Sequence, residues 1–335
     1  MPTTVLVTGA NGFLGRHLVA ELLQRHYQVR ALVRPESLAA ASPLPSLRSL
    51  PIECYAGDLC QPGTLERAAA GCEAIIHAGA LAQVNPARNP AVWQVNYEGT
   101  KALLHLAQQE RVKRFVYVGT ANVFGFGSLQ HPGDETQPYT GRRYGLDYMD
   151  SKRAATDLVL QAVADWQLPA VLVHPTFMLG PSDSKPTSNA LLLALYRGEL
   201  PGYPAGGKNY VHVRDVAAAT VNALTQGRIG ESYILGNENL SYRAAFARIA
   251  AAMRVAPPRW GLPPVVARFY GAICDLKAHL TRRPGSLNAA MVAVANDGHY
   301  FTCQKARAEL GLAQTPLEVA VAEAFTWFQA HGYVE

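Results

Sequence analysis

The sequence is poor in cysteine, in charge and in long apolar runs, and each shortage excludes a class of protein. Its 335 residues include five cysteines and no Cys-x-x-Cys pair. An odd number of cysteines without that spacing argues against a disulfide framework and a structural zinc site, so we expect reduced thiols. No apolar stretch reaches the roughly 18 residues that a membrane span needs, and no leader peptide precedes the first apolar run. The expected location is therefore cytoplasmic.

A large excess of one charge is also missing. The chain has 30 Lys and Arg residues against 25 Asp and Glu residues, a formal net charge of +5, with no long basic run. This balance argues against nucleic acid as a partner and gives little support to a membrane surface. The ten histidines show no metal-ligand spacing such as His-Glu-x-x-His, so we expect no metal. With 49% hydrophobic residues, the composition is that of a globular chain, and its length favours one large domain carrying a smaller one.

Short apolar runs alternate with segments long enough for helices. The runs lie at residues 4–8, 29–33, 52–56, 74–77, 115–119 and 171–174. This alternation predicts an α/β fold with a parallel sheet covered on both faces. Right-handed crossovers then make a doubly wound, Rossmann-type sheet the expected topology.

Three glycines follow the first expected strand and precede apolar residues at helical spacing. Glycine permits a positive φ and a close approach of the backbone to a pyrophosphate, and a helix N-terminus supplies N–H donors. Their place between a strand and an amphipathic helix favours a dinucleotide site over a merely tight turn. We expect cofactor contacts from Gly9, Asn11, Gly12, Phe13, Leu14 and Gly15.

The end of the second expected strand bears on the choice between NADP and NAD. An acid at this point would bind the ribose hydroxyls, but the strand ends at Arg34, which suits a 2'-phosphate. NADP(H) is therefore favoured, and NAD(H) stays open because Arg34 could be a solvated surface residue with Glu36 at the ribose. After the third strand, Asp58 could contact the adenine amino group or simply close a turn.

Later segments suggest how the two domains share the chain. Prolines break up residues 175–209, a strand and a helix over 210–223 and a strand over 232–235 follow, and the remainder is mostly helical. We expect an NADP-binding domain over residues 1–174, to which 210–235 return. Residues 175–209 and 236–335 would form a smaller, interleaved, mostly helical substrate-binding region.

Tyr148 and Lys152 stand four residues apart in a helical pattern and therefore share one helix face. A nearby ammonium lowers the pKa of a phenol and makes it a workable general acid and base. Thr120 follows the fifth expected strand, upstream of this pair.

Seven segments together resemble the extended short-chain dehydrogenase/reductase family, part of the NAD-dependent epimerase/dehydratase superfamily. They are TGANGFLG, GDL, HAGA, NYEGT, VGTANVFG, YMDSK and YVHVRDVA, and the resemblance covers nearly the whole chain. It implies that Tyr148 transfers the proton, Lys152 binds the nicotinamide ribose and Thr120, in place of the commoner Ser, steadies the substrate oxygen. It also implies a backbone-supporting role for Asn96, although an Asn at a helix start is an equal reading. Further implied cofactor contacts are Asp58, Leu59, Ala78, Gly79, Ala80, Asn96, Tyr148, Lys152, Pro175 and Thr176.

The segment after the sixth strand bears on the kind of family member. Nucleotide-sugar enzymes resemble Arg-x-x-Asn-x-x-Gly-Pro there, whereas this chain has Phe177 in the Asn position. An apolar side chain cannot pair with pyrophosphate oxygens, and the pattern instead resembles dihydroflavonol 4-reductase-like and 3β-hydroxysteroid dehydrogenase-like proteins. We expect NADP(H)-dependent reduction of a ketone or aldehyde on an apolar or aromatic small molecule. A nucleotide-sugar epimerase or dehydratase and an NAD-dependent 3β-hydroxysteroid-type dehydrogenase remain alternatives, and a non-catalytic NADP sensor is least favoured.

Four apolar side chains are candidates for substrate contact, with ordinary core packing as the other reading. They are Phe124, Phe126, Phe177 and Met178. Arg142 and Arg143 could bind an acidic substrate tail, but solvated loop charge is favoured.

Residues 260–283 combine apolar and basic residues at helical spacing, and Arg268, Lys277, Arg282 and Arg283 supply the charge. Such a helix can lie on a membrane, although a lid or packing helix is the favoured reading. A homodimer through the helix that carries Tyr148 also remains open, because relatives often pair in that way.

Overall fold

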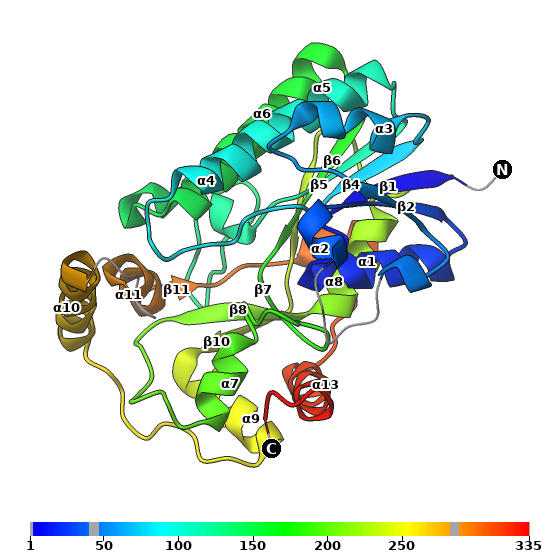
Figure 1. Cartoon of the computed structure of the whole chain (residues 1–335). Helices are drawn as coiled ribbons and strands as arrows, with labels where there is room; N and C mark the ends of the chain where they lie inside the picture. The colour runs from blue at the N-terminus through cyan, green and yellow to red at the C-terminus, as the bar shows by residue number, and fades with distance from the viewer. Residues whose placement is uncertain (1–2, 40–46, 282–287, 335) are drawn as a thin grey trace.

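A seven-stranded parallel sheet organises the protein. The computed structural model describes residues 3–39, 47–281 and 288–334, and Figure 1 shows the chain. The strand order is β3-β2-β1-β4-β5-β6-β9, with every pair parallel. The doubly wound α/β fold expected from the sequence is confirmed. The strands are β1 (Thr4–Thr8), β2 (Gln28–Val33), β3 (Glu53–Ala56), β4 (Ala74–His77), β5 (Arg114–Val118), β6 (Ala170–Pro175) and β9 (Ser232–Leu235).

Both faces of this sheet are buried, as a parallel sheet requires. In β1, Val5 and Val7 join one core cluster and Leu6 joins the other, because successive side chains of a strand point to opposite faces. Helices α1 (Phe13–Gln24) and α8 (Val213–Asn222) pack together over the first face. Over the second face lie α3 (Glu66–Ala69), α5 (Gly99–Gln109) and α6 (Asp147–Trp166) (Figure 1).

A second, smaller sheet lies beside the first. Its central strand β8 (Gly207–His212) pairs with β7 (Phe177–Leu179) and β11 (Gly298–His299) in parallel, and with β10 (Glu238–Ser241) in antiparallel. Helices α7 (Ala190–Tyr196), α9 (Tyr242–Met253) and α13 (Leu317–Ala330) share a core cluster with this sheet.

This sheet corrects one expectation about the returning segment. The strand predicted from residue 210 belongs to β8 and pairs within the smaller sheet, where buried Tyr210 packs with the surrounding helices. Of residues 210–235, only α8 and β9 return to the main sheet. The smaller region therefore has a small sheet in addition to the helices expected there.

The remaining helices lie at the margins. A short helix α2 (Pro35–Ala39) follows β2, and α4 (Pro90–Trp93) runs through a π-helical turn, Gln94–Glu98, into α5. At one side of the molecule α10 (Pro264–Thr281) packs on α11 (Ala289–Asn296) (Figure 1). Among the described residues, no helix has the length and apolar character needed to span a bilayer.

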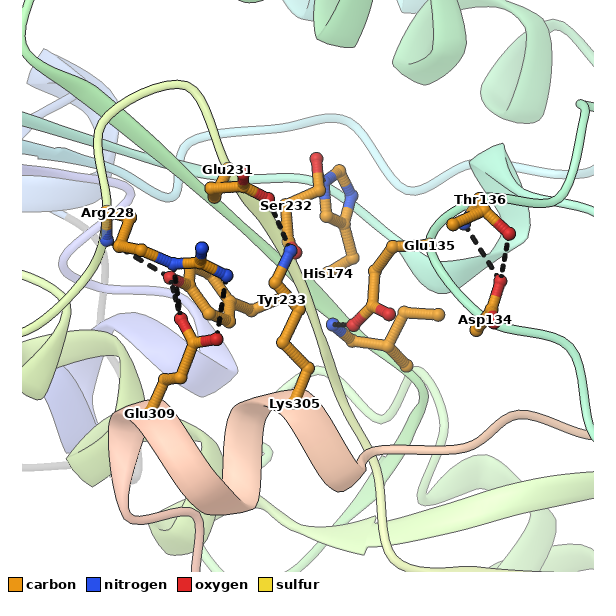
Figure 2. Close-up of polar contacts among 11 residues, drawn as sticks. Asp134, Glu135, Thr136, His174, Arg228, Glu231, Ser232, Tyr233, Lys305 and Glu309 are labelled. Atoms are coloured by element: carbon orange, nitrogen blue, oxygen red, sulfur yellow. Dashed lines mark hydrogen bonds and ion pairs between the residues drawn. The ribbon is translucent and has the colours of Figure 1, made fainter.

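Ion pairs fasten helix α12 (Gln304–Leu310) to β9 of the main sheet. Figure 2 shows Glu309 accepting hydrogen bonds from Arg228 and from the hydroxyl of Tyr233. The two bonds from Arg228 are 2.7 and 2.8 Å long, and the bond from Tyr233 is 2.7 Å long. One turn earlier, the ammonium of Lys305 pairs with Glu231. These contacts hold β9 at the edge of the sheet, beside β6.

Candidate active site

Three glycines shape the turn between β1 and α1. Gly9 has a φ of +69°, and a Cβ at this position would lie 2.8 Å from Gly79 Cα. A Cβ on Gly15 would lie 2.0 Å from the carbonyl oxygen of Gly9. Both positions therefore need glycine. The N–H of Gly12, which precedes α1, donates to that same carbonyl at 2.9 Å.

The start of α1 fits an anionic group. No side chain caps the helix and its first turn has no acidic residue, so its N–H groups and the positive end of its dipole remain for a ligand. Asn11, Phe13 and Leu14 lie at this turn, where the sequence placed them. A dinucleotide pyrophosphate has the charge that such a cradle binds. The residues present thus fit the nicotinamide dinucleotide that the motif indicates.

A chain of hydrogen bonds fixes the backbone after β4. The Gly79 N–H donates to Thr8 Oγ1 at 3.0 Å, Thr8 Oγ1 lies 2.8 Å from His77 Nδ1, and His77 Nε2 lies 3.0 Å from Thr100 Oγ1. Since the Thr100 hydroxyl donates to the Asn96 carbonyl, it must accept from His77 Nε2. Burial lowers the pKa of His77 to about 3, so the ring is neutral. Ala78, Gly79 and Ala80 therefore hold one fixed path beside the glycine turn.

The end of β2 is open to solvent. Arg34 follows this strand and forms a 3.3 Å ion pair with Glu36, and both side chains are at least 60% exposed. After β3, Asp58 Oδ1 accepts from the Cys60 N–H at 2.9 Å, which is the turn-closing role that the sequence left open. Leu59 packs against the backbone of Gly79. These residues occupy the same edge of the sheet as the glycine turn.

Lys152 is a buried cation at the centre of the site. It is 2% exposed, and its Nζ donates to the carbonyl oxygen of Val118 at 2.7 Å and lies 4.5 Å from the centre of the Tyr117 ring. No carboxylate pairs with it among the described residues. Burial lowers the pKa of Lys152 to about 7. An unpaired ammonium in such a place is typical of a ligand-binding or catalytic group.

Tyr148 lies one turn before Lys152 on α6. Burial raises the pKa of this phenol, and a hydrogen bond between the side chains of Tyr148 and Thr120 lowers it in part. Thr120 follows β5 and is 7% exposed. In the protein alone the phenol is therefore protonated at neutral pH, which is the form that can donate a proton.

Asn96 joins the segment after β4 to α6. Its Oδ1 accepts from the Leu81 N–H at 2.8 Å, and its Nδ2 donates to the Leu81 carbonyl and to Ser151 Oγ, each at 3.2 Å. It lies in the π-helical turn and does not cap a helix start. The side chain thus holds the backbone beside Tyr148 and Lys152.

The rings of Phe126, Tyr144 and His299 form an aromatic wall near Tyr148. The ring of Phe126 stacks on His299 with 4.0 Å between centroids, and Phe126, Tyr144 and Tyr148 share one apolar cluster. Burial, followed by the charges of Lys208 and Arg143, lowers the pKa of His299 well below its ordinary value. The imidazole is neutral, so this wall is mainly apolar.

Lys208 lies on the same face of the smaller sheet as His299. Lys208 pairs with His299 in register, and its Nζ lies 5.2 Å from the centre of the Phe177 ring. Burial lowers the pKa of Lys208 to about 8. No carboxylate pairs with it in the part of the chain that the structure describes. It is a second cation near the aromatic wall.

The four proposed substrate contacts do not share one cleft. Phe124 is buried on His174 in a core cluster against which Phe126 packs, and Met178 packs against the core of the main sheet. Phe177 and Met178 are neighbours in β7, so their side chains point to opposite faces and cannot both line one wall. We therefore keep only Phe126 and Phe177 as candidate contacts.

Other predicted residues have partners within the protein. Thr176, which follows Pro175 at the end of β6, donates to Asn209 Oδ1 at 2.8 Å. Arg143 binds Asp297 at 3.0 Å and lies over the Phe126 ring, so it is not poised for an acidic substrate tail. Arg142 is exposed, as solvated loop charge would be.

Sequence reasoning missed Tyr144, Lys208 and His299. His299 belongs to a two-residue strand with no periodicity to reveal it. Lys208 could have been found, because it lies two residues before buried Tyr210 and so shares its face of the strand, where a charged residue is unusual.

Comparison with known proteins agrees with this geometry. A model of the NAD dependent epimerase/dehydratase family matches residues 5–236. A Synechocystis protein named "Putative dihydroflavonol 4-reductase" is 33% identical over 100% of this chain and 97% of its own. "Sterol demethylase protein B" of Methylococcus capsulatus is 28% identical over 99% of this chain and 100% of its own.

A solved structure has the same fold. The crystal structure of a nucleoside-diphosphate-sugar epimerase from Pseudomonas aeruginosa matches with a TM-score of 0.79 and 26% identity, covering 99% of each chain. The family match spans the glycine turn, Thr120, Tyr148 and Lys152. The chain belongs to the NAD-dependent epimerase/dehydratase family, the extended short-chain dehydrogenases/reductases, and is an NAD(P)-dependent enzyme acting on a CH–OH or carbonyl group.

Proposed function

We propose that this protein is an NADP(H)-dependent reductase of a ketone or aldehyde on an apolar or aromatic small molecule. The observation that carries the proposal is the buried Lys152 ammonium, one helical turn from Tyr148, without a carboxylate partner among the described residues. A structural cation would be paired, whereas an unpaired one suits the ribose hydroxyls of a nucleotide and the proton transfer of a neighbouring phenol.

The chain's own residues would divide the chemistry as follows. Tyr148 donates its proton to the oxygen of the carbonyl as negative charge develops there. Thr120 donates to the same oxygen and fixes its position. Lys152 favours the phenolate that remains. When bound, the cofactor supplies the hydride that reduces the carbonyl carbon.

The preference for NADP(H) rests on Arg34. Its pairing with Glu36 is long and exposed, and such pairs contribute about 0–1 kcal/mol. A 2'-phosphate carries more charge than a carboxylate and binds a guanidinium through two hydrogen bonds. Arg34 can therefore leave Glu36 for the phosphate at little cost.

The substrate class rests on the aromatic wall. Phe126 packs in the same cluster as Tyr148 and stacks on neutral His299, and Phe177 lies beside Lys208, the residue paired with His299 in the smaller sheet. Such surfaces bind flat or lipid-like molecules through burial of apolar area. The names of the Synechocystis and Methylococcus relatives, a putative dihydroflavonol 4-reductase and a sterol demethylase protein, support this class.

A nucleotide-sugar epimerase is the second candidate, and Lys208 favours it. This unpaired cation lies over Phe177, the very residue that replaces the expected Asn, and could bind a diphosphate. The similarity to the Pseudomonas epimerase supports the same reading.

Calorimetric titration separates the two candidates. NADPH and NADH would each be titrated into the purified protein, followed by UDP-glucose in the presence of each cofactor. Our proposal expects tighter NADPH binding, no UDP-glucose signal, and NADPH oxidation with aromatic ketones. A UDP-glucose signal that Lys208→Gln abolishes, and that the exposed control Lys185→Gln keeps, would establish the epimerase reading instead.

A further inference from the structure

One helix exposes an unusual row of large apolar side chains. On α10 they are spaced alternately by three and four residues, which places them on one helix face. The row is Val266, Phe269, Ile273, Leu276 and Leu280, and we add to it the exposed Val265 and Trp260, which precede them in the sequence. Phe269 is 70% exposed, and Leu280 and Trp260 are 73% and 74% exposed. We call these seven residues the α10 row.

The exposure of the α10 row is not shared by the opposite side of the helix. Gly271 is buried, and a Cβ on it would lie 2.9 Å from Ala289 Cα and 3.1 Å from Val292 Cγ2 of α11. One face of α10 is thus fixed by close packing, while the other stays in water. Leaving a large apolar side chain in water forgoes the free energy of burying it, so a contiguous row of them indicates a surface that binds something apolar.

Charge indicates what binds there. Between Arg254 and Thr281 the sequence has four arginine or lysine residues, at 254, 259, 268 and 277, against one acidic residue, Asp275. This stretch carries a net charge of +3 of the whole chain's +5. Arg282 and Arg283, which the sequence analysis assigned to the same basic segment, lie outside the described residues.

The same charge argues against a second copy of the chain as the occupant. Symmetric pairing of two α10 rows would bring the two positive stretches together, and like charges at an interface oppose association. An anionic lipid surface satisfies both features, because it accepts apolar side chains at the acyl boundary and attracts cations at the headgroups. The exposed Trp260, which precedes α10 in the sequence, suits the headgroup level.

We propose that α10, with Trp260, docks on an anionic lipid surface, the α10 row entering the acyl boundary. The docked helix would lie one helix away from the candidate active site. Ala290, Ala293 and Val294 of α11 pack in the same cluster as Tyr148 and Phe126. Docking itself does not depend on the proposed function.

Vesicle co-sedimentation of the full chain tests the proposal. Phosphatidylcholine vesicles with about 30 mol % phosphatidylglycerol would be compared with phosphatidylcholine alone. We expect binding to the anionic vesicles that weakens when salt rises from about 0.1 M to about 0.5 M. Phe269→Gln/Ile273→Gln/Leu276→Gln should lower binding roughly tenfold or more. The matched control Leu129→Gln/Ile229→Gln/Val319→Gln changes three exposed apolar residues elsewhere and should bind as the unchanged protein does.

Two further measurements complete the test. Tryptophan emission should shift to shorter wavelength on anionic vesicles, and Trp260→Phe should remove that shift. Light scattering after size exclusion gives the oligomeric state of each variant. Equal binding by the α10 triple variant, no binding by the unchanged protein, or a dimer that the triple variant converts to a monomer would each overturn the proposal. NADPH titration of the same preparations reports separately on the proposed function.

Discussion

The ammonium of Lys152 donates a hydrogen bond to the carbonyl oxygen of Val118 at 2.7 Å. Val118 ends β5 and Lys152 lies in the second turn of α6, so this bond joins the strand before Thr120 to the helix that carries Tyr148. Burial lowers the pKa of Lys152 to about 7. A residue whose charge opposes folding thus holds two parts of the site in place.

Lys152→Met should therefore inactivate the enzyme and stabilise the fold. Between pH 7 and the ordinary lysine pKa, residue 152 carries a proton in the unfolded chain but not in the folded chain. The unchanged protein therefore loses stability as pH falls through this range. After the loss of the Val118 bond is counted, we expect a net gain of roughly 2 kcal/mol near pH 7.

Thermal unfolding without nucleotide, measured from pH 7 to 10, checks this expectation. The difference in Tm between Lys152→Met and the unchanged protein should shrink as pH rises. The exposed control Lys101→Met should show a difference that does not vary with pH. A Lys152→Met protein less stable than the unchanged one at pH 7 would contradict the assigned pKa.

Tyr148→Phe should separate binding from chemistry. The phenyl ring keeps the packing of Tyr148 in the cluster with Phe126 and Tyr144, so NADPH affinity should change by less than about threefold. Turnover should fall by roughly 10²–10⁴-fold because the proton donor is gone. Tyr27→Phe, at the turn after α1, serves as the control and should turn over normally. Full activity of Tyr148→Phe would remove this residue from the mechanism.

Glu36→Gln should strengthen NADPH binding, because it frees the Arg34 guanidinium from its 3.3 Å ion pair. Arg34→Gln should weaken NADPH binding by about tenfold or more while leaving NADH nearly unchanged. Arg67→Gln, an exposed change on α3, is the control. Fluorescence titration with both cofactors measures all of these. If Arg34→Gln weakened NADH as strongly as NADPH, the 2'-phosphate assignment would fail.

Gly15→Ala should abolish nucleotide binding. The added Cβ would lie 2.0 Å from the carbonyl oxygen of Gly9, so either the turn or α1 must move. Gly63→Ala is the matched control, because a Cβ at Gly63 meets no atom within 4 Å. We expect normal NADPH affinity for Gly63→Ala and none measurable for Gly15→Ala, with far-ultraviolet circular dichroism to confirm that both are folded. Tight binding by Gly15→Ala would show that the nucleotide does not rely on this turn.

Local patterns predicted the main sheet and the glycine turn because the physics that forms them is local. The run of β-branched residues in β1, the glycine at the positive φ of position 9 and the four-residue spacing of Tyr148 and Lys152 are all readable within a few neighbours. The expectation that Arg34 binds a 2'-phosphate likewise rested only on the residues at the end of one strand.

Long-range packing set the limits of prediction. The sequence does not distinguish the four apolar candidates Phe124, Phe126, Phe177 and Met178 from one another. Only the pairing of β7 with β8 and the stacking of His299 on Phe126 show which of them belong to the aromatic wall and which to the core. His299 reaches Phe126 across more than half the chain, so no local window connects them. The smaller sheet was missed for the same reason, since its strands are short and drawn from distant segments.

The interleaved strand β9 has a consequence for synthesis. The edge of β6 is completed only when Ser232–Leu235 arrives, roughly 60 residues later, which at 5–20 residues per second is about 3–12 s of translation. During that interval the nascent chain presents an open strand edge with buried-type residues on both faces. Even after β9 emerges, its ion pairs with α12 cannot form until Glu309 and Lys305 have been synthesised. The first half of this protein therefore leaves the ribosome as an unfinished sheet, and a chain truncated before residue 232 should be a substrate for chaperones and proteases rather than a free-standing nucleotide-binding module.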